Sequence, residues 1–289
     1  MFEVELILLI LAFIVTLIAV ISDIKTTEVP DYANYFLLFS ALSLRLLYSL
    51  ATRDWSFILA VLISFPIMFI LALTMYKTRQ WGGGDAKLLI SLSIALATYP
   101  SFLLEFFTPK LIFPFPITLF INVLIIGAAY SLIYAVSLAI KGRKKFTNSF
   151  AEIIKRTKII QIKILSATVL AIILLAVTSI PKIILIAAII LPIILFYVYI
   201  FIKTVEKVCL IKIIPVEKLM EGDLIIENIF YKNKLIHKKS QELTKKQIKL
   251  IKKANIKEVR IRQGIVFTPA FLLSLIVSLI FGNLLLYLI

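Results

Sequence analysis

The sequence predicts an all-α polytopic membrane protein of about eight transmembrane helices, with a small cytoplasmic α/β module before the last helix. Of the 289 residues, 61% are hydrophobic, whereas ordinary soluble domains are about 45–50% apolar. Apolar runs close to the roughly 20 residues that cross a bilayer as a helix recur along the chain. Basic residues gather in alternate connecting segments, which is the pattern of the positive-inside rule.

The expected spans follow one another closely through most of the chain. They cover about residues 4–22, 33–51, 55–76, 86–107, 115–140, 163–180, 182–203 and 265–288. Only Ser179-Ile180-Pro181-Lys182 separates the sixth from the seventh. These two form either a tight helical hairpin or one kinked, partly re-entrant element, because Pro181 and Pro192 interrupt helical hydrogen bonding.

The connecting segments divide into two sets by charge. Those at 52–54, 108–114 and 181–182 hold only Arg53, Lys110 and Lys182 as basic residues. The alternate set holds Lys25, Lys77, Arg79, Lys87, a basic cluster from Lys141 to Lys163 and the lysine-rich 203–264 segment. Eight spans with the N-terminus outside place this second set in the cytoplasm. The formal net charge of +16 is confined to such loops, so nucleic acid is not an expected partner.

A water-soluble module is expected at 204–264, the one long polar stretch. Val208–Ile214, Leu224–Ile226 and Val259–Arg262 have the composition of short strands. Thr244-Lys245-Lys246-Gln247 fits a capping box that opens a helix through about Ala254. The lysines of this module are expected to rest on anionic lipid headgroups.

The chain therefore divides into four expected regions. They are a membrane-embedded domain that holds the candidate site (1–140), a basic cytoplasmic loop with an additional transmembrane hairpin (141–203), the α/β module (204–264) and a C-terminal transmembrane helix (265–289). With one cysteine, Cys209, and one histidine, His237, neither an internal disulfide nor a protein-ligated transition metal is expected.

Two aspartates stand at the edges of apolar runs on the same predicted membrane face. Asp23 lies in Ser22-Asp23-Ile24-Lys25, and Asp85 lies in Trp81-Gly82-Gly83-Gly84-Asp85-Ala86-Lys87. A carboxylate there is expensive to desolvate and is therefore usually functional. Two carboxylates that meet at one face are the minimum apparatus for water-mediated peptide hydrolysis.

The three glycines before Asp85 allow a sharp backbone turn and a close approach by another segment. The ordinary alternative for Asp85 is a helix N-cap, and for Asp23 a charge that marks the end of a span. Because Asp23 lies at the negative pole of its helix and Asp85 at the positive pole of the next, we expect Asp85 to be the ionised partner and Asp23 to hold the shared proton.

Four nearby charges are weaker candidates for pKa tuning or substrate contact. Lys25 and Lys87 each follow an aspartate by two residues, and are better placed to snorkel toward headgroups. Glu28 and Asp31 flank Pro30 in an expected solvated loop.

The two motifs together resemble the GxGD membrane aspartyl proteases, and within them the archaeal prepilin and preflagellin peptidases. The resemblance rests on Asp23, Lys25 and Val29-Pro30-Asp31, followed about sixty residues later by Gly82-Gly83-Gly84-Asp85-Ala86-Lys87-Leu88. It covers residues 1–140 most strongly and extends to Phe267-Thr268-Pro269-Ala270-Phe271 near the C-terminus.

The resemblance implies removal of the leader peptide from prepilin-like and preflagellin-like proteins at the cytoplasmic membrane face. Asp23 and Asp85 become the catalytic pair, Gly82 to Gly84 the loop that shapes the site, and no metal or cofactor is needed. The chain departs from the bacterial pattern because it lacks the paired Cys-x-x-Cys insertion.

Two other classes of function stay open at this point. In an ion-coupled transporter, Asp23 and Asp85 would bind protons or cations, although both lie at membrane edges and no inverted repeat is evident. A membrane-anchored scaffold would use the 204–264 module to recruit a partner or lipid, and leaves the Gly-Gly-Gly-Asp motif without a purpose.

Overall fold

The computed structural model describes residues 2–177, 181–231, 234–239, 241, 243–254, 256–262 and 264–288. The chain forms two compact units. The first unit comprises residues 1–132 and 266–289, and the second comprises 133–265. The last stretch of the chain therefore belongs to the same unit as the first.

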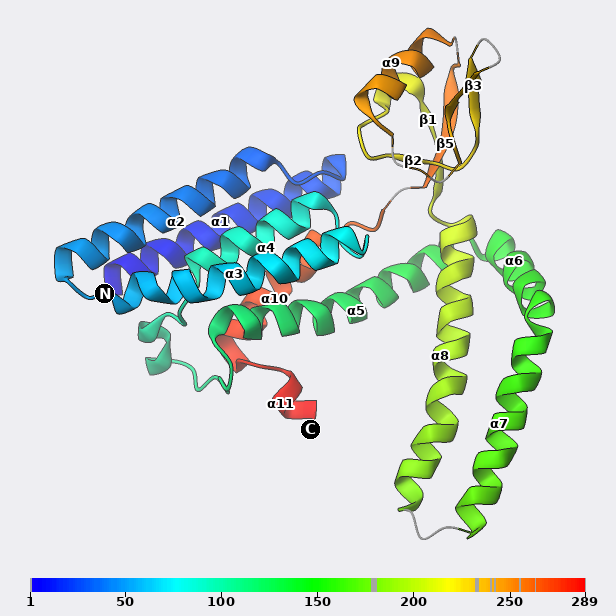
Figure 1. The fold of residues 1–289 in the computed structure, drawn as a ribbon, viewed down its shortest axis with the longest axis horizontal. Helices are drawn as coiled ribbons and strands as arrows, with labels where there is room; N and C mark the ends of the chain where they lie inside the picture. The colour runs from blue at the N-terminus through cyan, green and yellow to red at the C-terminus, as the bar shows by residue number, and fades with distance from the viewer. Residues whose placement is uncertain are drawn as a thin grey trace. The chain divides into compact units, whose positions relative to one another are not determined.

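The first unit is built from helices. They are α1 (Phe2–Thr26), α2 (Asp31–Thr52), α3 (Ser56–Lys77), α4 (Gly83–Ala95), the 3-10 helix η1 (Ser101–Glu105), the first part of α5 (Phe115–Lys141), α10 (Thr268–Phe281) and α11 (Leu285–Leu288). α4 packs against α1, α2 and α3, and α1 also packs against α10 (Figure 1). The two ends of α4 are thus fixed by the helices around it.

Side-chain burial in the first unit follows the helix–helix contacts. Ala12, Ala19 and Ala41 are fully buried, and such small residues let helix backbones approach closely. Other faces of α2 and α3 expose large apolar side chains such as Phe39, Leu47 and Ile63. Surfaces of this kind are rare on soluble monomers and suit contact with lipid.

Five helices within the described residues are long and apolar enough to cross a membrane. They are Phe2–Thr26, Asp31–Thr52, Ser56–Lys77, Phe115–Lys141 and Ile189–Val208. This number, together with the mostly helical fold, is consistent with a polytopic membrane protein. The expected number of eight spans is not reached by this criterion.

Two of the expected spans are shorter than their apolar runs. The run at 86–107 yields α4, which ends at Ala95 and is followed by a turn at Leu96, the extended residue Pro100 and η1. At 1.5 Å per residue, its 13 residues extend about 20 Å, less than the roughly 30 Å hydrocarbon core. The run at 265–288 is divided at Gly282, whose positive φ of 76° and contact with the Lys110 backbone end α10.

A buried arginine lies inside the first unit. The Arg45 side chain of α2, 1% exposed, donates hydrogen bonds from Nη1 to the Phe57 carbonyl (3.1 Å) and from Nη2 to the Ala95 carbonyl (3.0 Å). Ala95 is the last residue of α4, where a cation complements the helix dipole. Arg45 thus ties the C-terminal end of α4 to its neighbours.

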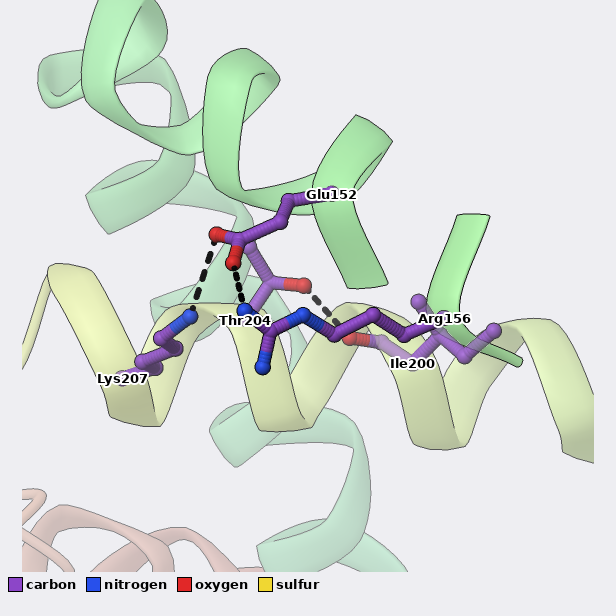
Figure 2. Close-up of polar contacts among 5 residues, drawn as sticks. All are labelled: Glu152, Arg156, Ile200, Thr204 and Lys207. Carbon is purple, nitrogen blue, oxygen red and sulfur yellow. Dashed lines mark hydrogen bonds and ion pairs between the residues drawn. The ribbon is translucent and has the colours of Figure 1, made fainter. Parts of the chain in front are cut away.

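The second unit begins with the rest of α5, followed by α6 (Arg143–Arg156), α7 (Lys158–Val177) and α8 (Lys182–Val208). The segment expected to be a basic loop is therefore helical over α6. Its apolar side chains explain this, since Phe146 contacts Phe201 of α8 and Ile153 is buried. Figure 2 shows Glu152 of α6 held between Arg156, at 2.6 Å, and Lys207 of α8, at 3.3 Å. The expected junction between the sixth and seventh spans, at Ser179 and Ile180, lies outside the described residues.

Short strands, one 3-10 helix and one α-helix follow α8 in the part of the second unit that the structure describes. They are β1 (Ile211–Pro215), the 3-10 helix η2 (Val216–Lys218), β2 (Leu224–Ile225), β3 (Ile229–Tyr231), β4 (Lys234–His237), α9 (Lys245–Lys253) and β5 (Glu258–Arg262). β5 pairs antiparallel with both β1 and β2, and β3 pairs with β4. Thr244 and Gln247 form the capping box that the sequence indicates at the start of α9. Ile225, Ile251 and Val259 are central to the small core of this segment.

Candidate active site

Asp23 lies in the last turn of α1, and its side chain is 7% exposed. The helix continues to Thr26, and the Thr27 amide donates to the Asp23 carbonyl at 2.8 Å. The carboxylate atom Oδ2 accepts two hydrogen bonds from Thr268, one from the backbone amide at 3.2 Å and one from Oγ1 at 2.9 Å. Asp23 therefore meets the first residue of α10, which lies 245 positions further along the chain.

Asp85 lies in the first turn of α4, outside the five candidate spans. Its Oδ2 accepts a hydrogen bond from the Gly82 amide at 3.2 Å, which holds the carboxyl group over the N-terminal end of its own helix. The ordinary interpretation of Asp85 as the N-cap is therefore wrong: the N-cap is Gly82, and Asp85 is the third helical residue, whose side chain accepts a hydrogen bond from the N-cap amide. This hydrogen bond does not exclude a chemical role for Asp85, because the charge of Asp23 also raises the pKa of its carboxyl group.

Gly84 is the glycine of the motif that has no room for a side chain. A Cβ atom at Gly84 would lie 2.7 Å from the Cβ of Val29. At Gly83 the nearest atom to such a Cβ would be the Tyr76 ring, at 3.6 Å, which is an ordinary contact. The close approach expected of this motif therefore takes place at Gly84, against Val29.

The two sequence motifs meet in three places. Besides the contact between Gly84 and Val29, the Asn34 Nδ2 group donates to the Gly84 carbonyl at 3.3 Å. Lys87 Nζ lies 2.6 Å from Asp31 Oδ1. The start of α2 thus packs on the start of α4, and this packing brings the end of α1 close to Asp85.

The surroundings of Asp85 contradict the expectation that it is the ionised partner. Burial of the Asp85 carboxyl group and the charge of Asp23 raise the pKa of Asp85 to about 7, although the Gly82 amide opposes this. The expectation that Asp85 is the ionised partner considered the helix dipole and omitted desolvation, which is the larger effect here. Asp23, at the unfavourable end of α1, lies instead at the favourable N-terminal end of α10.

The four weaker candidates separate into two pairs. Lys87 and Asp31 form an ion pair, so Lys87 is directed to Asp31 and not to Asp85. Asp31 is exposed but has a charged partner, and it begins α2 instead of lying in a loop. Lys25 and Glu28 are exposed.

Three contributors to the site were missed by reasoning from the sequence. Thr268 binds Asp23, and Asn34 binds Gly84. Trp81, 8% exposed, packs its ring against those of Phe120, Phe267 and Phe271, and so anchors the segment just before the glycines. A Thr-Pro pair at a helix start was the available signal for Thr268, since proline is favoured in a first turn.

These observations define a multi-pass helical membrane protein with two electrostatically coupled carboxyl groups at adjoining helix ends. Residues 10–132 match the model of the type IV leader peptidase family. This range contains both aspartates and the three glycines, and it ends before α10. This part of the chain is thus similar to the type IV leader peptidases, in agreement with the resemblance in its motifs.

A curated relative supports the same assignment. Over 155 residues the chain is 27% identical to a protein of Methanothermobacter thermautotrophicus described as prepilin peptidase EppA. The alignment covers 52% of this chain and 40% of that relative, so the chain spans less than half of the relative's length. No solved structure matches the chain.

Proposed function

We propose that the protein is a membrane aspartyl endopeptidase that removes the leader peptide of prepilin-like or preflagellin-like proteins at the cytoplasmic membrane face. The observation that carries this proposal is the coupling of Asp23 and Asp85 where the two matching motifs pack together. The match of residues 10–132 to leader peptidases supports the class of reaction.

In the proposed mechanism, Asp85 holds the shared proton and Asp23 is ionised. Asp23 takes a proton from a water molecule while the water oxygen attacks the scissile carbonyl carbon, and Asp85 donates its proton toward the carbonyl oxygen. The resulting tetrahedral intermediate collapses when the amide nitrogen receives a proton from Asp23 and a hydroxyl group of the intermediate returns its proton to Asp85. The carbon–nitrogen bond then breaks, and the leader and the mature protein leave as acid and amine.

The proposed membrane arrangement has the N-terminus outside and the site toward the cytoplasm. This arrangement requires the chain to cross the membrane over α4 and η1, and again over α7 and α8. The basic residues of α6 and of the segment after α8 then lie on the cytoplasmic side, where anionic lipid headgroups attract them. Glu28 is exposed near the end of α1 and is available to a basic leader. The negative charge of Asp31 is offset by Lys87, which makes Asp31 the weaker attractor.

The proposal is tested by cleavage of a panel of archaeal prepilins and preflagellins in membranes. Asp23→Asn and Asp85→Asn should each reduce cleavage by at least about 10³-fold, as loss of a catalytic acid or base does. The matched control is Asp54→Asn, because Asp54 is exposed at the start of α3 and caps it through Ser56, a task that asparagine also performs. Full cleavage by either of the first two variants contradicts the proposal. Absence of cleavage by the wild type favours the transporter, for which proton-coupled flux is the direct assay.

A further inference from the structure

The N-terminal end of α10 contacts the candidate catalytic residues directly. Thr268 is 0% exposed, and its amide and hydroxyl both donate to the same oxygen, Oδ2, of Asp23. The first amides of a helix have no acceptor within the helix. At α10, Asp23 supplies the acceptor for the Thr268 amide, and Pro269 removes the need for the next.

The position of Thr268 is fixed by the packing of α10 along its length. Phe267 and Phe271 pack on Trp81, directly before the three glycines. Phe267 also occupies space over Gly127 of α5, where a Cβ atom would overlap its ring. At the other end of α10, Asn122 Nδ2 donates to Ser278 Oγ and to the Gly282 carbonyl, both at 2.7 Å. α10 is thus held against α5 at both ends.

The carboxylate of Asp23 needs such support. It lies in the last turn of α1, whose dipole disfavours a negative charge, and Asp85 adds a second acid nearby. Thr268 supplies two hydrogen-bond donors to this carboxylate at the N-terminal end of α10. Two donors on one oxygen also fix the rotation of the carboxylate, so that Oδ1 has a defined direction.

We propose that Thr268 is a positioning residue for Asp23, and that α10 completes the active site from outside the family-matching segment. This inference rests on the proposed function, because the role of Thr268 is exerted through Asp23 as the base. It adds that residues 10–132 do not suffice for full activity, since they lack the donor pair. The hydroxyl orients the base and does not touch the substrate.

The test compares Thr268→Val, Thr268→Ser and Thr268→Ala in the full chain, in membranes, with a prepilin that the wild type cleaves. Thr268→Val keeps the shape and the backbone amide but removes the hydroxyl donor. We expect kcat to fall about tenfold, the size of one lost hydrogen bond to a charged group, with KM within about twofold because substrate binding is untouched. Thr268→Ser should restore at least half of kcat, and Thr268→Ala should match Thr268→Val.

The matched control is Thr16→Val on α1. Thr16 is equally buried, but its hydroxyl bonds only within its own helix, to the Ala12 carbonyl at 2.6 Å. This control should retain wild-type kcat. Wild-type kcat in both Thr268→Val and Thr268→Ala, or a Thr268→Ser variant as slow as Thr268→Val, overturns the positioning role.

The Asp23→Asn variant in the same assay separates this failure from failure of the proposed function. If Asp23→Asn also cleaves, the proposed function fails. If Asp23→Asn is inactive, only the role of Thr268 fails.

Discussion

At the scale of single residues, the environment of Asp85 determines the pKa of its carboxyl group. Asp85 begins a helix, which by itself favours its charged form. Its enclosure and the neighbouring charge of Asp23 have the larger effect and raise its pKa to about 7. In the proposed mechanism the two aspartates, one near the end of α1 and the other at the start of α4, therefore have different roles.

This difference predicts how cleavage depends on pH. If Asp85 must be protonated, the active form is present below about pH 7 and is lost as the pH rises through that value. We expect kcat/KM to fall about tenfold for each further pH unit above it. The measurement is the rate of prepilin cleavage from about pH 5.5 to about pH 9 in one membrane preparation. The same membranes are then returned to about pH 6 to show that the loss of activity is reversible. A rate that stays level up to pH 9 contradicts this assignment of the proton.

At the scale of elements, the glycine motif makes one close contact, between the segment that precedes α2 and the start of α4. Of the three motif glycines, Gly84 is the one at which an added Cβ atom would come within 3 Å of another part of the chain. The atom it would meet, Val29 Cβ, is attached to the backbone, so neither side yields without a shift of the main chain.

Gly84→Ala is therefore expected to separate α4 from the segment before α2. Displacement of Asp85 by about 1 Å should reduce cleavage on the order of 10²-fold. Gly83→Ala is the matched control and should remain close to wild type, because its added methyl group has ordinary contacts. The Gly84→Ala, Val29→Gly double variant should cleave faster than it would if the effects of the two single substitutions simply added. Equal activity of the two alanine variants argues against this contact.

At the scale of the whole chain, the first unit is assembled from two segments separated by residues 133–265. The lipid-compatible outer faces and the five long apolar helices describe a multi-pass protein. The length of these helices does not indicate which end of each faces the cytoplasm. The proposed orientation rests on the distribution of basic residues between alternate connections, through the positive-inside rule.

The proposed orientation predicts which connections react with an impermeant thiol reagent. In a Cys209→Ala background, Arg53→Cys should be labelled in intact cells, because Arg53 is exposed between α2 and α3 on the proposed outer side. Lys144→Cys on α6 should be labelled only after permeabilisation. Labelling of both sites in intact cells, or the reverse order, contradicts a cytoplasmic position for the candidate site. Retained cleavage in each variant is the control for correct folding.

The sequence by itself determined the helical membrane class, the two aspartates and the glycine motif between the spans, and the likeness to prepilin peptidases. These features are local, since a run of apolar residues and the residues at its ends lie within one segment. Three features were decided by the tertiary structure alone. α4 ends at Ala95, whose carbonyl accepts a hydrogen bond from Arg45; the pKa of Asp85 is raised; and Thr268 donates hydrogen bonds to Asp23. The physical reason is that desolvation and hydrogen bonds between distant segments depend on which helices pack together, and a pattern within one segment carries no information about its neighbours.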